Sequence, residues 1–292
     1  MSWHRPYNEL GHNAGGRRAP GQRNLPVDNS GAGRSRCRAE FSNRLNVHAG
    51  SSRFSVHFVT SSDGKRRRIR DRFRSASPAI LPSLLQCDFL DLRSEVDAVT
   101  AAGCEILHLD VMDGHFVPNL TYGMPICRGL SGYGDVPLDV HLMISDPIAY
   151  VPQFADAGAD SITFHVEAVD DAGEVIDAIR RHDLVAGIAI NPDTPMSEMM
   201  RWIDRVDLAL VMSVQAGFGG QKFNPVAVER IAQLRSHRDD LLIEVDGGID
   251  ATTAPQCHAA GCDLFVVGSA IFGRDNYSVA VSEITQAMET AK

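Results

Sequence analysis

The sequence of 292 residues lacks several features that mark particular classes of protein. It contains no run of about 18 apolar residues, so no membrane-spanning helix is predicted. No GxGxxG pattern follows its first apolar segment, which argues against a dinucleotide-binding fold. It has no CxxC pair, and we interpret its cysteines as reduced, buried thiols of an intracellular protein: Cys37, Cys87, Cys104, Cys127, Cys257 and Cys262.

Charge is divided unevenly along the chain. Residues 1–74 contain 16 of the 28 Lys and Arg residues but only 5 of the 37 Asp and Glu residues. This asymmetry predicts a basic tail attached to an acidic domain. The acidic body argues against a broad nucleic-acid-binding surface, so no nucleic-acid partner is expected.

Residues 1–76 are predicted to form a basic, low-complexity, disordered extension, and residues 77–292 to form the folded domain. The extension is rich in Gly, Arg, Asn and Ser, so it cannot bury enough apolar surface to offset its ordering entropy. Its basic run KRRRIRDRFR, 65–74, is interpreted as a solvated tail, with nucleic-acid contact or targeting as alternatives. A transit peptide would also fit this composition, which makes a plastid the alternative to the expected cytoplasmic location. A functional chain that begins near Ser77 would fit equally well.

From Ser77 onward, short apolar runs alternate with helical patterns, and Gly, Asp, Asn or Pro bounds each run. Several helical patterns end in Ala-Gly, the expected helix stop. Such alternation predicts βα units and a parallel sheet. Eight consecutive units indicate a single (β/α)₈ TIM barrel, with a doubly wound sheet as the alternative. The predicted strands lie in 79–85, 106–112, 138–143, 161–167, 185–191, 208–214, 241–247 and 264–272.

Ionisable residues occur near the carboxyl ends of three predicted strands. Because alternate strand residues share a face, His108 and Asp110 point the same way, as do His141 and Asp246 on their own strands. A closed barrel has no solvated edge, so these groups are predicted to converge at the mouth, where barrel enzymes place catalysis. Two histidines and two carboxylates suit Zn²⁺, Fe²⁺ or Mn²⁺. The alternative is that each histidine is a hydrogen-bonded core residue.

Glycine-rich turns follow the last three predicted strands: GFGGQ at 217–221, DGG at 246–248 and GS at 268–269. Glycine lets backbone N–H groups approach an anion closely. The loops after strands seven and eight are the usual phosphate seat of this fold. The three turns together predict a phosphate site, although each alone could be an ordinary βα turn.

From about Ser77 to its end, the chain resembles the ribulose-phosphate 3-epimerase family. The matching segments are HLDVMDGHFVPN, LDVHLMI, VMSVQAGFGGQKF, IEVDGGI and VGSAIF, in the family's order and spacing. The resemblance covers roughly three quarters of the chain and excludes residues 1–76. One departure is Ala216, where the family usually carries proline; it predicts a looser loop at that position.

The resemblance implies roles for individual residues. His108, Asp110, His141 and Asp246 match the family's four metal ligands, with Asp110 and Asp246 as the two acid/base groups. His165 is given no catalytic role. Three methionines match residues that line the family's site, namely Met112, Met143 and Met212. The alternative is that they are ordinary core residues. The residues that match substrate and phosphate contacts are Ser83, His141, Gly217, Phe218, Gly219, Gly220, Gly247, Gly248, Gly268 and Ser269.

The implied activity is a metal-dependent interconversion of D-ribulose 5-phosphate and D-xylulose 5-phosphate at C3, a step of the pentose phosphate pathway. Two bases would transfer the proton through an enediolate. The implied cofactor is one divalent cation per subunit (Zn, Fe(II), Mn or Co), with no organic cofactor. The expected partner is the sugar phosphate alone, without a membrane, and a homo-oligomer is expected.

Three other functions stay open. A hexulose phosphate epimerase, acting for example on D-allulose 6-phosphate, would share the metal and both bases. A metal-free decarboxylase or lyase usually relies on a catalytic lysine, but after Ser77 the only lysines are Lys222 and Lys292, neither at an inward strand position. A non-catalytic binding protein would carry its function in the extension.

Overall fold

The computed structural model describes residues 63–290 of the chain. The expectations for residues 1–62 lie outside the described residues, as does Cys37. The other five cysteines are free and buried, as predicted. None of the described helices is both long and apolar enough to cross a membrane.

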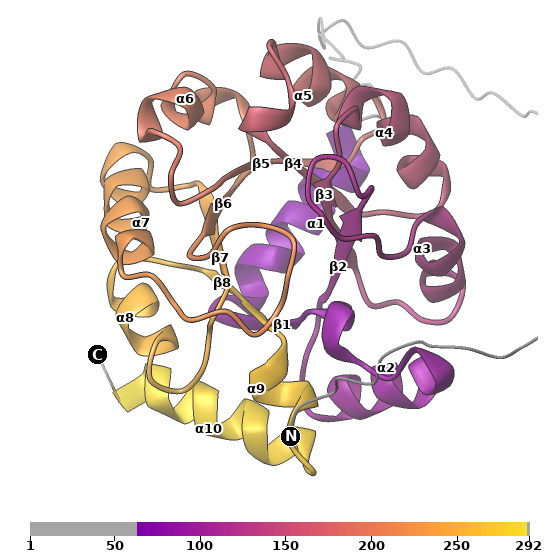
Figure 1. Ribbon diagram of the computed structural model, residues 1–292, viewed down its shortest axis with the longest axis vertical. Helices are drawn as coiled ribbons and strands as arrows, with labels where there is room; N and C mark the ends of the chain where they lie inside the picture. Colours follow the sequence, from indigo (N-terminus) through magenta and orange to yellow (C-terminus); the bar gives the residue numbers. More distant parts are fainter. Residues whose placement is uncertain (1–62, 291–292) are drawn as a thin grey trace, which may run out of the picture. The chain divides into compact units, whose positions relative to one another are not determined.

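Eight parallel strands form the centre of the described chain, as predicted for a single (β/α)₈ barrel (Figure 1). They follow one another around the sheet in the order β1-β8-β7-β6-β5-β4-β3-β2. An isolated parallel bridge between Ser83 and His108 joins the first strand to the second and brings the two ends of the sheet together. The strands are β1 (Ala79–Pro82), β2 (Leu107–Met112), β3 (Leu138–Met143), β4 (Ser161–His165), β5 (Val185–Ile190), β6 (Leu208–Met212), β7 (Leu242–Asp246) and β8 (Leu264–Val267).

Helices surround this ring of strands (Figure 1). The α-helices within residues 63–290 are α1 (Asp63–Ala76), α2 (Leu92–Ala101), α3 (Met124–Ser131), α4 (Pro147–Asp156), α5 (Ala172–Arg181), α6 (Met196–Met200), α7 (Val226–His237), α8 (Ala254–Ala259), α9 (Ser269–Phe272) and α10 (Tyr277–Thr290). Short 3-10 helices are η1 (Leu84–Gln86), η2 (Phe89–Asp91), η3 (Val166–Ala168) and η4 (Ile203–Arg205).

Alternation along the strands divides the buried residues between two layers. In β2, Leu107 and Leu109 belong to the large core between strands and helices, whereas Ile106, just before the strand, belongs to a separate core inside the barrel. Inside the barrel, Leu242 of β7 packs in that second core, two residues before the fully buried Glu244. The predicted inward face is therefore confirmed.

The predicted helix stops are also found. Gly103, Gly158 and Gly261 follow α2, α4 and α8 and have φ angles of 98°, 99° and 101°. This left-handed backbone conformation costs glycine little because it has no Cβ. The chain can therefore leave each helix abruptly and enter the next strand.

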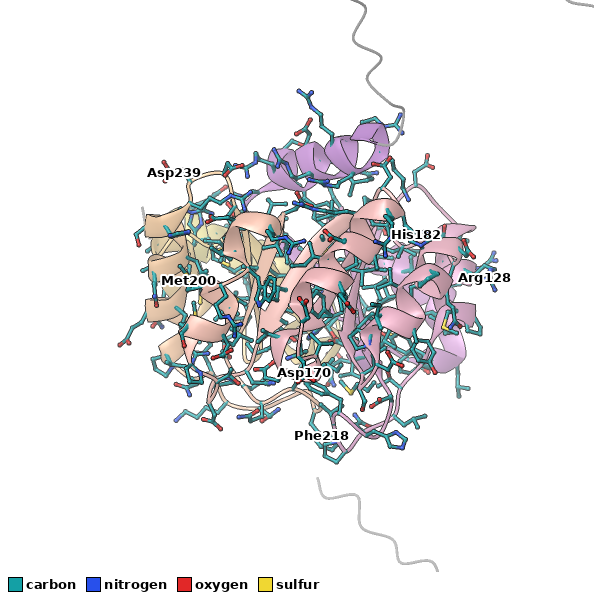
Figure 2. All side chains as sticks on the ribbon, turned by 90° about the horizontal axis from the view of Figure 1, so that it is seen from above. Arg128, Asp170, His182, Met200, Phe218 and Asp239 are labelled. Atoms are coloured by element: carbon teal, nitrogen blue, oxygen red, sulfur yellow. The ribbon has the colours of Figure 1, made fainter. Side chains whose placement is uncertain are left out.

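Residues 63–76 form helix α1, which differs from the solvated tail that the sequence predicts for them. Phe73 is fully buried and Ile69 packs beside it against the core inside the barrel. Lys65 Nζ lies 3.3 Å from Asp160 Oδ1, one residue before β4. Figure 2 shows α1 across one end of the barrel, with Phe218 at the opposite end. The basic run thus pairs with the acidic body of the same chain.

Candidate active site

The structure brings His108, Asp110, His141 and Asp246 together inside the barrel. Ligand atoms of these four side chains all lie within 4.8 Å of one another. Strands β2 and β3 are paired so that Asp110 lies beside His141, and β6 and β7 so that Met212 lies beside Asp246. The strand register, and not closeness in sequence, therefore assembles the group.

His108 is fixed by carboxylates deeper in the barrel. Its Nδ1 lies 2.7 Å from Asp139 Oδ2 and 3.2 Å from Glu244 Oε1. Its Nε2 is buried, has no hydrogen-bond partner among the described residues, and lies 3.4 Å from Asp110 Oδ1. Burial alone would lower the pKa of His108, but the surrounding carboxylates raise it well above its usual value. The surroundings of the His108 ring therefore favour a positive charge.

Asp110 is held on several sides. Ser83 Oγ donates a hydrogen bond of 2.5 Å to its Oδ2, and His141 Nδ1 lies 3.2 Å from its Oδ1. Its backbone is fixed as well, because its carbonyl oxygen accepts from Thr121 Oγ1 and its N–H donates to Tyr122 Oη. This carboxylate consequently has little freedom to turn.

The two candidate acid/base carboxyls have opposite pKa shifts. Burial raises the pKa of Asp246 to about 7, and the negative charge of Asp110 adds to the effect. Burial also opposes ionisation of Asp110, but His108 and His141 outweigh it and lower the pKa of Asp110. When two neighbouring carboxyl groups have different pKa values, the one with the lower pKa can act as a base while the other acts as an acid.

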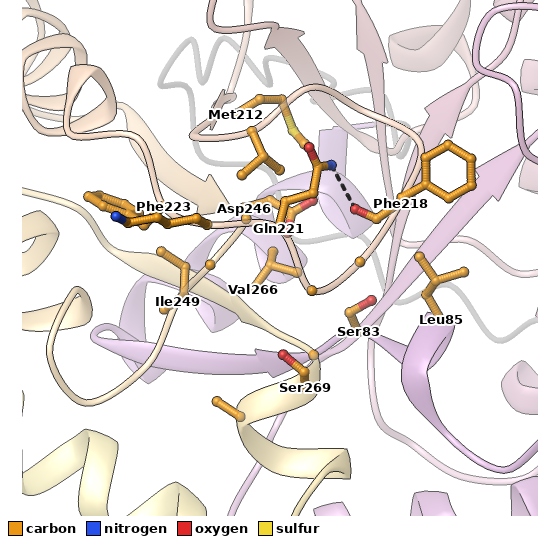
Figure 3. A pocket seen from close by; sticks show the side chains of 18 of the residues that line it. Ser83, Leu85, Met212, Phe218, Gln221, Phe223, Asp246, Ile249, Val266 and Ser269 are labelled. Carbon is orange, nitrogen blue, oxygen red and sulfur yellow. Dashed lines mark hydrogen bonds between the residues drawn. The ribbon is translucent and has the colours of Figure 1, made fainter. Parts of the chain in front are cut away.

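A cavity of about 570 Å³ opens above these carboxyls, a size typical of small-molecule sites. Figure 3 shows Ser83, Asp246 and Ser269 around it. Although His108 and His141 themselves are fully buried, the other predicted site residues all line the cavity. They are Ser83, Asp110, Met112, Met143, Met212, Gly217, Phe218, Gly219, Gly220, Asp246, Gly247, Gly248, Gly268 and Ser269.

The loops after β6 and β7 pack closely at the rim of the cavity. A Cβ atom on Gly248 would lie only 2.5 Å from the backbone nitrogen of Phe223, and the φ of Gly248 is 61°, so this position requires glycine. Gln221 Nε2 donates to the carbonyl oxygen of Phe218 at 2.8 Å (Figure 3). Asn119 Nδ2 donates to the carbonyl oxygen of Gly217 at 2.7 Å, which joins the loop after β2 to the same rim.

The backbone of Ala216 is held by a hydrogen bond, whereas the sequence predicts a looser loop at this position. Its N–H donates a hydrogen bond of 3.0 Å to Asn191 Oδ1, at the end of β5. A proline at this position would have no N–H to donate. The substitution therefore adds a contact between two loops of the site.

Sequence reasoning missed two features of the site. Lys222 lines the cavity and is the only Lys or Arg among its lining residues in the described part of the chain. Its place directly after GFGGQ was the available signal. His165, which received no role, lies with its Nε2 only 2.9 Å from His141 Nε2. Its inward position on β4 was the corresponding signal.

A sequence model of the ribulose-phosphate 3 epimerase family matches residues 79–272. The chain belongs to this family. It is 43% identical over 210 residues to ribulose-phosphate 3-epimerase of Bacillus subtilis, which covers 70% of this chain and 97% of that protein. It is 41% identical over 210 residues to the Escherichia coli K12 protein of the same name, covering 70% of this chain and 93% of that protein. Family membership shows that the chain is an enzyme of the isomerase class.

Solved structures with low sequence identity share the fold. KGPDC from Streptococcus mutans, in complex with D-R5P, has a TM-score of 0.58 and 16% identity, and the match covers 73% of this chain and 98% of that chain. Orotidine 5'-phosphate decarboxylase from Pyrococcus horikoshii has a TM-score of 0.53 and 15% identity, covering 72% and 99%. These similarities support the barrel architecture alone.

Proposed function

We propose that this chain interconverts D-ribulose 5-phosphate and D-xylulose 5-phosphate by transferring a proton at C3. The observation that carries the proposal is the pair of the buried Asp110 and the half-buried Asp246, two carboxyls with opposite pKa shifts that line one cavity. Inverting a carbon centre requires proton removal on one face and proton delivery on the other. Two carboxyls in different protonation states meet both needs.

The proton transfers follow from these states. The ionised carboxylate accepts the C3 proton, and the electron pair of the broken C–H bond moves into an enediolate. The protonated carboxyl then delivers its proton to the opposite face of C3, which completes the inversion. In the reverse direction the two groups exchange roles, so each turnover leaves the pair ready for the opposite reaction.

The residues fit one divalent cation, which would be Zn, Fe(II), Mn or Co. The unpartnered, buried Nε2 of His108 and the Nδ1 of His141 both face Asp110 Oδ1, at 3.4 and 3.2 Å. His108, Asp110, His141 and Asp246 would hold the cation. When bound, it supplies Lewis acidity that lowers the cost of placing negative charge on the substrate oxygens. Asp139, at 2.7 Å from His108 Nδ1, keeps the ring of His108 oriented.

The remaining cavity residues bind and orient the substrate. The backbone N–H groups of the glycine-rich loops would bind the phosphate group, with Lys222 as the positive charge on the cavity wall. The methionines would form an apolar wall that excludes water from the reacting carbon. Ser83 would hold Asp110 through their 2.5 Å hydrogen bond. The loop residues concerned are Gly217, Phe218, Gly219, Gly220, Gly247, Gly248, Gly268 and Ser269, and the methionines are Met112, Met143 and Met212.

An epimerisation assay on D-ribulose 5-phosphate, with and without a chelator, tests the proposal. We expect xylulose 5-phosphate to form, chelation to stop the reaction, and added divalent metal to restore it. Turnover that chelation leaves unchanged would refute the metal requirement. Faster turnover of D-allulose 6-phosphate would support a hexulose phosphate epimerase instead.

We also expect a cytoplasmic homo-oligomer, which cell fractionation and light scattering would test.

A further inference from the structure

His165 packs directly behind His141. The two ring planes are inclined by 23° with centroids 5.0 Å apart, and their Nε2 atoms lie 2.9 Å from each other. Both side chains are fully buried. The other nitrogen of His141, Nδ1, faces Asp110 Oδ1 at 3.2 Å. One nitrogen of His141 thus faces the proposed cation site and the other faces His165.

Two groups compete for the far nitrogen of His165. Glu167 Oε2 and Asn191 Nδ2 each lie 3.2 Å from His165 Nδ1. The carboxylate of Glu167, when it is ionised, can only accept a hydrogen bond, and the NH₂ group of Asn191 can only donate one. The side-chain amide of Asn191 is oriented by Ala216, whose N–H donates to Asn191 Oδ1, so that the nitrogen of the amide faces His165.

Glu167 is ionised in this environment. Its Oε1 accepts hydrogen bonds from the backbone N–H of Asn191 at 2.8 Å and from Thr194 Oγ1 at 2.6 Å. Burial opposes the charge on Glu167, but the hydrogen bond from His165, together with these two hydrogen bonds, lowers its pKa to about 2. A carboxylate is therefore available to accept a proton from His165.

The choice at His165 fixes the proton on His141, because a neutral imidazole carries one N–H. If His165 Nδ1–H donates to Glu167, then His165 Nε2 must accept from His141 Nε2–H. The Nδ1 of His141 then keeps a free lone pair on the side of Asp110. If His165 Nδ1 instead accepts a hydrogen bond from Asn191, the proton of His165 lies on Nε2 and is donated to His141 Nε2. The proton of His141 then lies on Nδ1, where it prevents a cation from binding.

We propose that His165 and Glu167 are positioning residues that hold His141 in the tautomer whose Nδ1 can bind a divalent cation. The inference rests on the metal-dependent function proposed above, because only a bound cation would use the free lone pair of His141 Nδ1. Partners behind metal-ligating histidines change metal affinity by about 10–100-fold when they are mutated. An effect of that size is expected from the loss of the carboxylate acceptor.

Glu167→Gln tests the proposal with little change in shape. The amide oxygen of Gln can still accept from Asn191 N–H and Thr194, while its NH₂ group replaces the acceptor that faces His165. The dissociation constant for Mn²⁺, measured by titration calorimetry, should rise about tenfold or more. Glu198→Gln is the matched control: the side chain of Glu198 is 46% exposed and pairs with Arg201 at 3.2 Å, so loss of its charge should leave Mn²⁺ affinity unchanged.

Asn191→Asp should rescue the Glu167→Gln variant. The aspartate would still accept from Ala216 N–H and would place a second acceptor oxygen next to His165 Nδ1. We expect the double variant to regain most of the Mn²⁺ affinity. ¹⁵N spectra of the Zn²⁺-loaded wild type should show the proton of His141 on Nε2 and the proton of His165 on Nδ1.

The outcomes separate this inference from the function on which it rests. Wild-type protein that binds Mn²⁺, together with a folded Glu167→Gln variant that binds it equally well, would overturn the relay alone. The same holds if the double variant is folded and recovers no affinity. Wild-type protein that binds no Mn²⁺, Zn²⁺, Fe²⁺ or Co²⁺ would overturn both the relay and the metal-dependent function.

Discussion

Arg66 of α1 and Asp207, one residue before β6, form a two-pronged ion pair across 141 residues of sequence. The Nη2–Oδ1 distance is 3.1 Å and the Nε–Oδ2 distance is 3.0 Å. The side chain of Asp207 is only 1% exposed and also accepts from the backbone N–H of Ala186. This pair and the buried Phe73 make α1 a structural part of the barrel.

Removal of α1 should destabilise the protein. A chain of residues 77–292 would lose the burial of Phe73, worth about 1.5–3 kcal/mol, and would leave the buried Asp207 without Arg66, which costs about 3–5 kcal/mol for a buried pair. Thermal and denaturant unfolding should show a clearly lower stability than in a chain of residues 63–292, which retains the helix. Equal stability of the two chains would contradict the structural role of α1.

Asp246→Asn should nearly abolish turnover, because an amide neither accepts nor donates the C3 proton. General acid–base groups typically contribute about 10²–10⁴-fold to the rate, so kcat should fall by at least about 100-fold. Asp110→Asn should have an effect of the same size. Far-UV circular dichroism and metal content should be measured in parallel. A folded, metal-loaded variant with near-normal kcat would disprove the two-base assignment.

Ser83→Ala should slow the reaction without unfolding the barrel. It removes the 2.5 Å hydrogen bond to Asp110, and hydrogen bonds to charged groups contribute about 1.5–3 kcal/mol, or about 10–100-fold in rate. Ser94→Ala is the control, since Ser94 donates to Asp91 in an exposed pair of the same kind. Steady-state kinetics should show a loss in kcat/KM for the first variant and no loss for the second.

Metal affinity should increase with pH. The carboxylates around His108 outweigh its burial and raise its pKa well above the usual value, so its ring carries a proton that a bound cation must displace. For one displaced proton, affinity for Mn²⁺ should fall about tenfold for each pH unit below the pKa of His108. Calorimetry at pH 6, 7 and 8, in buffers of different ionisation enthalpy, would measure both the affinity and the released proton. Affinity that is constant over this range would contradict the raised pKa.

The barrel and its central carboxyls could be predicted from the sequence because both depend on local patterns. Each strand is a short apolar run with a clear boundary, and the two-residue period places Asp110 and Asp246 on the inner face. The tautomer relay was not predictable, since the contact of His165 with His141 depends on the packing of β4 against β3.

Helix α1 was missed for a different reason. Its apolar contacts come mainly from Ile69 and Phe73, which stand four residues apart among arginines and give a weak helical pattern. Its charged partners, such as Asp160 and Asp207, lie in loops that come near the helix only when the barrel has formed. A basic segment and an acidic domain were visible in the sequence, but their pairing with each other was not.

The bridge between Ser83 and His108 marks the seam where the ring of strands closes, and the proposed catalytic residues lie on both sides of that seam. Ser83 follows β1, Asp110 lies on β2, and Asp246 arrives only with β7, after most of the chain has been synthesised. A partly folded barrel with an open seam would therefore contain individual ligands without a competent site. Regain of activity during refolding would thus report closure of the ring, whereas recovery of helical signal would report earlier steps.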